Sequence, residues 1–210
     1  WMEITASMVK ELRDRSGAPM MDCKSALVEA AGDLERAHRI LRQKGQATAA
    51  KRSAKATSEG AVSAYIHAGG RIGVLIEVNC ETDFVARTAD FQTLAKDLAM
   101  HVAACEPRAV DRDEVTESVL NEEREIYRQQ AAATGKPAAV IEKIVAGRME
   151  KFYQEFCLLE QPFVRDPNLT VRDVINAVIA KTGENIRVRR FARFVLGQDG
   201  APKGTAHTAR

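Results

Sequence analysis

Four cysteines and four histidines are the side chains of this 210-residue chain that could ligate a metal, form disulfides or act as nucleophiles. They are Cys23, Cys80, Cys105 and Cys157, and His38, His67, His101 and His207. No two cysteines form a Cys-x-x-Cys pair and no histidine has a partner at ligand spacing, which argues against zinc and against a disulfide framework. We therefore expect reduced thiols, no bound metal and no cofactor.

The chain also lacks the short motifs of common catalytic sites. It has no Gly-x-x-x-x-Gly-Lys-Ser/Thr phosphate loop, no Gly-x-Ser-x-Gly nucleophile turn, no His-Glu-x-x-His zinc helix and no dinucleotide-binding glycine motif. These absences favour a protein that acts by binding over an enzyme. No catalytic residue is predicted.

The most unusual polar stretch is residues 79–85, which read Asn-Cys-Glu-Thr-Asp-Phe-Val. It follows a run, 71–78, whose alternation predicts a strand, and precedes a run, 91–102, whose spacing predicts a helix. Asp83 and Phe84 therefore lie at a strand-to-helix corner, where turn and capping residues are usual. From the residues alone, Phe84 either folds back into the core or waits for a partner.

Residues 2–45 are predicted to form a compact bundle of three short helices. Apolar residues recur at helical spacing, and Gly, Pro and Asp stand where helices begin or end. The predicted boundary residues are Gly17 and Pro19 for the first helix, Asp22 and Gly32 for the second, and Asp33 and Gly45 for the third. Because so small a unit has too little core for a catalytic cleft, we expect a docking module.

Met20 and Met21 are predicted to lie in the turn before the second helix rather than on a helical face. Methionine is flexible and polarisable, so the pair either fills the bundle core or forms an adaptable contact surface. The residues alone favour the core.

Residues 58–197 are predicted to form an α+β core, in which an antiparallel three-stranded sheet packs with helices. A hairpin over 60–78 turns at 68–71, a helix over 91–102 covers its apolar face, and residues 185–196 form the closing strand. Further helices are predicted at about 113–133, about 137–159 and after Thr170, with an irregular passage at 161–167. Residues 46–57 are predicted as a basic helical linker and 198–210 as a disordered tail.

Two surfaces of this core leave alternatives open. The helix ending near residue 159 carries an apolar stripe, which we interpret as core or as a helix-helix seam. Arg187, Arg189, Arg190 and Arg193 crowd the closing strand. They form either a nucleic-acid face or a guard against edge pairing, and the thin aromatic interleaving favours the guard.

The composition is that of an ordinary globular protein, with 45% hydrophobic and 29% charged residues. Lys and Arg total 31 against 29 for Asp and Glu, so the net charge of +2 gives no reason to expect nucleic-acid or membrane partners. No apolar run approaches the roughly 18 residues of a membrane span, and the N-terminus lacks the pattern of a secretory signal. We expect a cytoplasmic protein and interpret Trp1, before Met2, as a cloning remnant.

Three stretches of the chain form long signatures. They are Ile4-Thr5-Ala6 to Leu12-Arg13 with Gly17, Met20-Met21-Asp22-Cys23-Lys24, Ala30 and Gly32-Asp33; then Glu77-Val78-Asn79-Cys80-Glu81-Thr82-Asp83-Phe84-Val85; and then Gly183-Glu184-Asn185-Ile186-Arg187-Val188-Arg189-Arg190. Together they resemble the bacterial elongation factor Ts family in its short form. The resemblance extends over residues 2–197, with the three signatures in the family's order.

The resemblance implies a guanine nucleotide exchange factor that acts on elongation factor Tu, in its GDP-bound and nucleotide-free forms, without covalent chemistry. The N-terminal bundle resembles a ubiquitin-associated (UBA-like) fold, which in this family docks the nucleotide-binding domain of the GTPase. On this basis Arg13, Met20 and Met21 become expected partner contacts. Thr82, Asp83, Phe84 and Val85 match the family segment that intrudes on the Mg²⁺ and phosphate side of the nucleotide site.

The chain departs from longer family members, which carry two related core halves and an inserted helical hairpin. Here there is one β-hairpin and one closing strand, which leaves an edge strand and the apolar stripe of residues 141–159. Homodimerisation would supply the missing half by symmetry, so we expect a homodimer.

Two other classes of function stay open beside the exchange factor. A UBA-type protein-binding scaffold would need only residues 2–45 and leaves the corner at 79–85 unexplained. An RNA-binding protein would use Arg187 to Arg193 and Lys51 to Lys55, and its affinity would fall steeply with salt.

Overall fold

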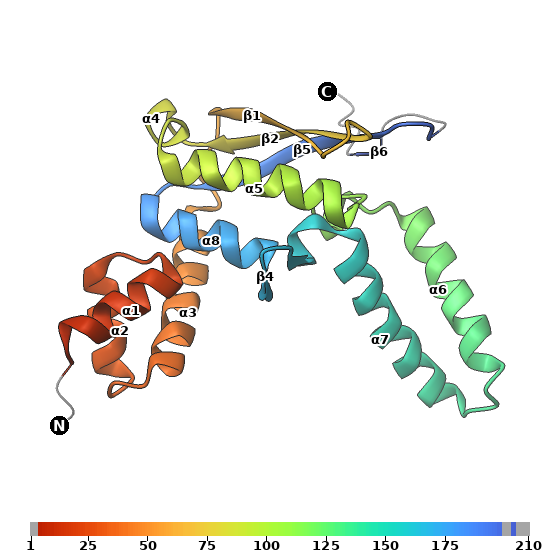
Figure 1. Ribbon diagram of the computed structural model, residues 1–210. Helices are drawn as coiled ribbons and strands as arrows, with labels where there is room; N and C mark the ends of the chain where they lie inside the picture. The colour runs from red at the N-terminus through yellow and green to blue at the C-terminus, as the bar shows by residue number, and fades with distance from the viewer. Residues whose placement is uncertain (1–3, 199–202, 205–210) are drawn as a thin grey trace. The chain divides into compact units, whose positions relative to one another are not determined.

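A computed structural model describes residues 4–198 and 203–204 (Figure 1). The chain divides into two compact units, and each is described by itself. The first contains the described residues up to Ser63, together with Glu77–Asp97 and Arg172–Arg189. The second contains Ala64–Ile76, Leu98–Val171 and the described residues from Arg190 onward.

The first three helices form the predicted bundle. They are α1 (Ala6–Ser16), α2 (Met20–Glu29) and α3 (Leu34–Arg52). The Thr5 side chain caps α1, Asp33 caps α3 by accepting from Arg36 N at 2.9 Å, and Gly17 ends α1 at a φ of 67° that favours glycine. Their apolar faces meet in a core made of Val9, Leu12, Cys23, Ala26, Leu27, Ala30 and Ala37.

Two predicted helix boundaries in the bundle are wrong. Pro19, not Asp22, stands at the N-cap of α2, so Met20 and Met21 belong to its first turn. Asp22 also lies in this turn, where its negative charge interacts favourably with the positive end of the helix dipole. Gly45 does not end α3, which continues to Arg52. Gly45 keeps a negative φ and is buried against α8, so it serves close packing rather than termination.

The predicted hairpin and closing strand are confirmed as one antiparallel sheet. Its strands are β1 (Glu59–Ile66), β2 (Ile72–Cys80) and β5 (Ile186–Val195), with the two-residue strand β6 (Lys203–Gly204) added beside β5 in the order β1-β2-β5-β6. Gly69 and Gly70 make the hairpin turn with positive φ values of 86° and 67°. Gly60 lies so close to β2 that a Cβ there would stand 2.2 Å from the carbonyl oxygen of Val78.

One face of the sheet is buried under α5 (Ala89–Cys105). In β2 the inward residues alternate as the sequence predicts, and they are Val74, Ile76 and Val78. The helix contributes its predicted apolar face, made of Phe91, Leu94, Ala95, Leu98, Ala99 and Val102, all of which are buried. This packing of one helical face on one sheet face is the α+β architecture that the pattern predicts.

In the second unit, α6 (Glu117–Ala132) and α7 (Ala138–Phe156) pack on each other as a helical hairpin. The short 3-10 helices η1 (Arg112–Glu114) and η2 (Leu158–Glu160) flank the pair. The predicted apolar stripe of α7 is buried against α6, so it is a helix-helix seam. The family resemblance assigns an inserted helical hairpin to longer members. A helical hairpin, made by α6 and α7, is present in this chain as well.

The passage predicted as irregular is a second, two-stranded sheet. Its strands are β3 (Pro162–Phe163) and β4 (Asp166–Thr170), which pair antiparallel with an irregular register. Helix α8 (Val171–Thr182) begins directly after Thr170, as predicted. The strand pattern was hidden because two prolines and a short turn leave too few residues for alternation to show.

A buried histidine ties this small sheet to α5. The side chain of His101 is fully buried, and the Val164 N–H donates to its Nδ1 at 3.1 Å. Since a backbone N–H can only donate, the ring proton lies on Nε2, which donates to Gln161 Oε1 at 2.9 Å. The Gln161 amide in turn donates to the carbonyl oxygens of Cys105 and Glu155. Every polar atom of the pair is therefore satisfied only while His101 is neutral.

Burial lowers the pKa of His101 because it disfavours the imidazolium. The unfolded chain, whose histidine titrates near pH 6.5, therefore binds this proton first as the pH falls. We predict that the free energy of unfolding drops as the pH is lowered below about 6.5, measured by urea unfolding. His101→Gln should remove that part of the pH dependence, whereas His67→Gln, at an exposed histidine, should keep it. An unchanged slope in His101→Gln would contradict this assignment.

Candidate functional site

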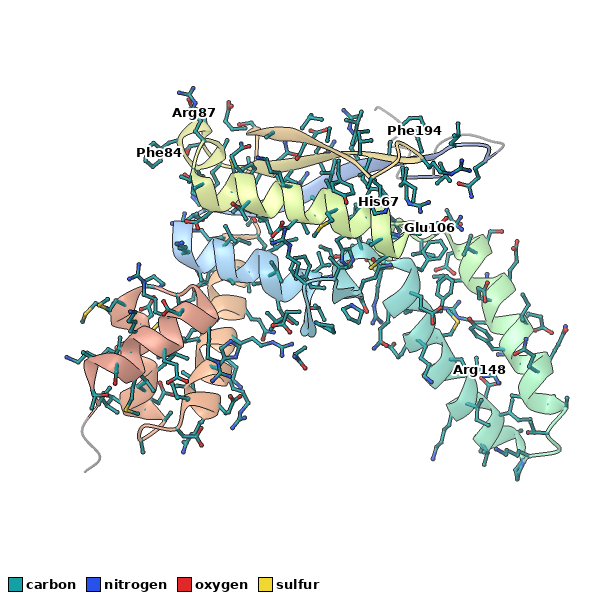
Figure 2. The ribbon with its side chains drawn as sticks, in the orientation of Figure 1. His67, Phe84, Arg87, Glu106, Arg148 and Phe194 are labelled. Atoms are coloured by element: carbon teal, nitrogen blue, oxygen red, sulfur yellow. The ribbon has the colours of Figure 1, made fainter. Side chains whose placement is uncertain are left out.

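The corner after β2 forms a single helical turn, α4 (Asp83–Ala86). Thr82 has extended backbone angles and caps this turn, since its Oγ1 accepts from Val85 N at 3.4 Å. Val85 and Ala86 are buried and hold the turn on the unit. Phe84 points away from the unit, as Figure 2 shows. Its side chain is 76% exposed. Of the two interpretations left open for Phe84, the folded-back core aromatic is wrong.

Asp83 forms a salt bridge with Arg87, which the sequence reasoning missed. The distance between Arg87 Nη2 and Asp83 Oδ2 is 2.6 Å, and both side chains are exposed. Such an exposed i,i+4 pair contributes only about 0.3–0.5 kcal/mol. A partner can therefore draw the Asp83 carboxylate or the Arg87 guanidinium into new contacts at little cost.

Two carboxylates brace the corner against the turn between α8 and β5. Glu184 accepts from the backbone N–H of Thr82 at 3.0 Å and from its hydroxyl at 2.7 Å. Glu81 reciprocates by accepting from the backbone N–H of Asn185 at 2.6 Å. Each turn thus supplies the anion that satisfies the other turn's free N–H group. The sequence shows both glutamates, but nothing in it pairs residues about a hundred positions apart.

Asn185 extends this brace to the end of α3. Its buried side-chain amide donates to the carbonyl oxygens of Ser53 at 3.4 Å and Lys55 at 2.8 Å. Arg52 Nη1 also lies 3.7 Å from Glu81 Oε2. The segment that follows α3 is therefore held by the same residues that hold the corner.

The sulfur of Cys80 completes the corner from inside. Burial raises the pKa of this thiol to about 11, so it stays protonated near neutral pH. The thiol donates to the carbonyl oxygen of Thr82 at 3.1 Å. A protonated, buried thiol is a packing and hydrogen-bonding group rather than a nucleophile.

The second group of predicted site residues lies on the surface of the bundle. Met20 is 53% exposed and Met21 is 73% exposed, so neither fills the core, and the interpretation favoured by the residues alone is wrong. Arg13 is exposed in the last turn of α1. Because the bundle core closes without these side chains, they are free to contact another molecule.

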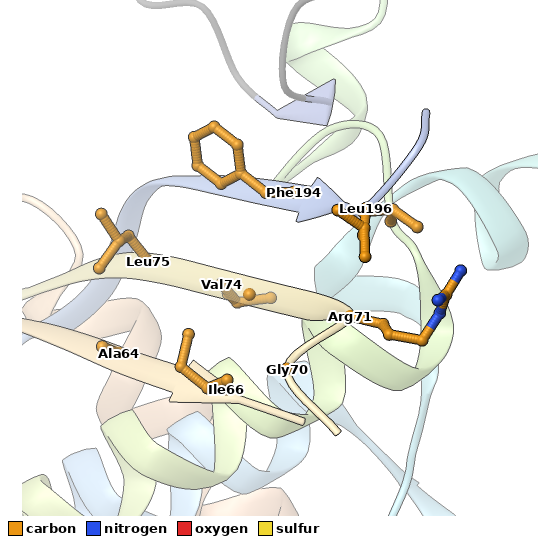
Figure 3. A pocket seen from close by; sticks show the side chains of 10 residues that line it. Ala64, Ile66, Gly70, Arg71, Val74, Leu75, Phe194 and Leu196 are labelled. Carbon is orange, nitrogen blue, oxygen red and sulfur yellow. The ribbon is translucent and has the colours of Figure 1, made fainter. Parts of the chain in front are cut away.

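An apolar groove lies on the exposed face of the sheet in the second unit (Figure 3). It has a volume of about 490 Å³ and is lined by residues that include Ala64, Ile66, Leu75, Phe194 and Leu196. Gly73 also lines it, and a Cβ at this position would stand 3.1 Å from Cδ1 of Ile66. Exposed apolar side chains grouped in this way commonly mark an interaction surface.

The four arginines of the closing strand do not share one surface. Arg187 and Arg190 are exposed, but Arg193 is buried and donates to the carbonyl oxygen of Ala103 at 3.3 and 3.2 Å. Its guanidinium also lies 3.4 Å from Glu106. One of the four charges on which an RNA-binding face would rest is thus neutralised inside the unit.

Within residues 4–198 and 203–204, no cluster of His, Cys, Asp and Glu has the arrangement of a metal site. None of the helices described there is long and apolar enough to cross a membrane.

Comparisons with known proteins give one consistent result. A family model described as Elongation factor TS matches residues 23–178. The chain is 63% identical over 195 residues to the elongation factor Ts of Moorella thermoacetica, an alignment that covers 93% of this chain and 96% of the relative. It is 59% identical over 200 residues to that of Carboxydothermus hydrogenoformans, covering 95% and 92%. For Fervidobacterium nodosum the values are 58% over 197 residues, covering 94% and 100%.

The carboxylate brace leads to a stability prediction. Glu184→Gln keeps the size of the side chain but removes the charge that accepts from Thr82, so it should lower the free energy of unfolding by about 1 kcal/mol. Glu122→Gln, on the exposed face of α6, should cost less than about 0.5 kcal/mol. Urea unfolding monitored by circular dichroism gives both values. Equal stability of the two variants would show that the brace contributes nothing.

Proposed function

This chain belongs to the elongation factor Ts family and has its role in translation elongation, and on that premise we propose that it is a guanine nucleotide exchange factor for elongation factor Tu. It binds the GDP-bound GTPase in the cytoplasm, promotes release of GDP and stabilises the nucleotide-free form. It performs no covalent chemistry. The observation that carries the proposal is Phe84, an exposed aromatic on a turn whose next two residues, Val85 and Ala86, are buried.

Exchange of this kind follows from thermodynamic linkage. A protein that binds the nucleotide-free GTPase more tightly than the GDP-bound form must weaken GDP binding by the same factor. It does not need to touch the nucleotide. It needs only contacts that the GTPase can satisfy after the nucleotide site has been distorted.

The corner is suited to make such contacts on the Mg²⁺ and phosphate side of the nucleotide site. Mg²⁺ requires a nearly ideal octahedral shell, so a small displacement of the groups around it is costly. Phe84 supplies the apolar wedge, and Asp83 competes for local polar partners after it leaves Arg87. Thr82 and Val85 hold the wedge in place, since one is braced by Glu184 and the other is buried.

The bundle is suited to dock the nucleotide-binding domain of the GTPase. Met20 and Met21 present adaptable apolar surface, and Arg13 adds a planar charged group. Residues 2–45 then act as a docking module, and the corner acts as the element that distorts.

Removing the wedge tests this proposal. A buried aromatic anchor at an interface is commonly worth about 2 kcal/mol or more, and about 1.4 kcal/mol is a factor of ten. Phe84→Ala should therefore slow GDP release from elongation factor Tu at least several-fold, measured with a fluorescent GDP analogue. The variant should unfold at the same temperature as the parent, because Phe84 is exposed in the free protein.

Ile126→Ala, at another exposed apolar residue on α6, is the matched control and should release GDP at the parental rate. If Phe84→Ala also keeps the parental rate, the wedge is wrong. If the parent itself does not accelerate release, the exchange function is wrong, and a scaffold or an RNA-binding role returns.

We also propose that the protein is a homodimer, now through a different surface from the one the sequence suggested. The stripe on α7 is buried against α6, and β6 pairs with part of β5, so among the described long strands of that sheet only β1 keeps a fully unpaired edge. The apolar groove on the sheet remains exposed. A second copy related by a two-fold axis would bury the same groove on both chains.

Sedimentation velocity tests the dimer. Phe194→Glu places a charge in the groove, so it should convert the dimer into a monomer at micromolar concentration, since a buried unpaired charge is costly. Ile126→Glu should leave the parental state unchanged. A parent that sediments as a monomer at working concentration would contradict the proposal.

A further inference from the structure

Helix α3 belongs to two parts of the first unit at once. At its start, Leu34, Ala37, Ile40 and Leu41 pack into the core of the bundle. Beyond these residues the same helix continues to Arg52 without interruption. The residues of this second half contact α8 and the brace at the corner rather than the bundle core.

The principal contact of this half is a buried carboxylate. The side chain of Asp173, in the first turn of α8, is only 5% exposed. It accepts from Arg42 Nε at 2.9 Å and from Arg42 Nη2 at 2.6 Å, and Gln46 Nε2 donates to it at 3.2 Å. A bidentate guanidinium fixes direction as well as distance. With the two donors one helical turn apart on α3, the carboxylate opposes both rotation and sliding of that helix.

Close packing reinforces the same junction. Gly45 lies between the two donors, and a Cβ at this position would stand 3.6 Å from the carbonyl oxygen of Asn176 on α8. The helices therefore approach with almost no side chain between them at this point. At its far end α3 is held again, by Arg52 near Glu81 and by Asn185 on the two carbonyl oxygens that follow the helix.

We propose that Asp173 is a positioning residue for nucleotide exchange. By holding Arg42 and Gln46 it makes α3 a rigid strut, which keeps Met20 and Met21 at a fixed separation from Phe84. This inference rests on the proposed exchange function.

The strut decides how binding at one contact is used at the other. If α3 could move freely, the bundle could dock through Met20 and Met21 without bringing Phe84 into contact with the GTPase. With a rigid link the two contacts are satisfied together only when the nucleotide site is distorted, so docking energy is used to weaken GDP binding. Loss of the contact between Asp173 and Arg42 should therefore lower the maximal rate of GDP release more than it lowers the affinity for the GTPase.

The test variant is Arg42→Met with Asp173→Asn. Changing both removes the ion pair without leaving an unpaired charge buried, so the fold should survive. The matched control is Lys44→Met, also on α3, which breaks the exposed pair between Lys44 and Glu29 of α2. Neither change touches Met20, Met21 or Phe84.

The first readout separates positioning from stability. At a saturating concentration of the double variant, GDP release from elongation factor Tu should be at least about threefold slower than with the parent. The concentration of factor that gives half the maximal rate should change less than about twofold. The Lys44→Met control should match the parent in both quantities. A variant with the parental maximal rate overturns the role of Asp173 in exchange.

The second readout does not depend on exchange. Spin labels introduced at Lys24 and Lys96, which are exposed on α2 and α5, report the separation of the two contact regions. We expect a narrow distance distribution in the parent and the control and a broader one in the double variant. An equally narrow distribution in the double variant overturns the claim that Asp173 holds α3 in place. A parent that does not accelerate GDP release from elongation factor Tu overturns the exchange function. The distance measurement then still shows whether Asp173 holds α3 in place.

Discussion

The candidate site depends on two reciprocal hydrogen bonds between distant turns. Glu184 accepts from the backbone N–H of Thr82, and Glu81 accepts from that of Asn185. A strand that turns directly into a one-turn helix leaves backbone N–H groups without partners, and so does the turn between α8 and β5. Each turn solves this for the other by contributing one carboxylate. Because these bonds join residues about a hundred positions apart, the corner forms only when the whole unit has folded. Asn185 and Arg52 connect the end of α3 to the same brace.

This construction explains how an exposed phenylalanine is tolerated at a defined place. An exposed aromatic ring lowers solubility and gains nothing in the free protein. Here its neighbour Val85 is buried and Thr82 is bonded from both sides, so the ring is held out from the surface rather than left to collapse onto it. Folding already fixes the position of the Phe84 ring. Less conformational entropy is therefore lost when a partner binds it.

Much of the fold could be predicted from the sequence, because its signals are local. Helical spacing located the helices, alternation located the hairpin, and the pattern of Asp33 and Gly17 located two helix ends. Gly45 misled because a glycine marks either a helix end or a close approach, and only the position of α8 decides between them. The corner was recognised as unusual and the residues alone left the exposure of Phe84 open, but the roles of Glu81, Glu184 and Asp173 were not found. Those roles depend on partners 102 to 131 residues away, which no local pattern encodes.

Linkage provides the most direct test of the central claim, since the free energy with which the factor distinguishes two states of the GTPase must equal the free energy by which it weakens GDP. Two ratios should be measured by calorimetry. One is the affinity of this protein for nucleotide-free over GDP-bound elongation factor Tu, and the other is the affinity of the GTPase for GDP without and with saturating factor. We expect the two ratios to be equal and well above one. A protein that binds both states of the GTPase equally would contradict the account, however tightly it binds.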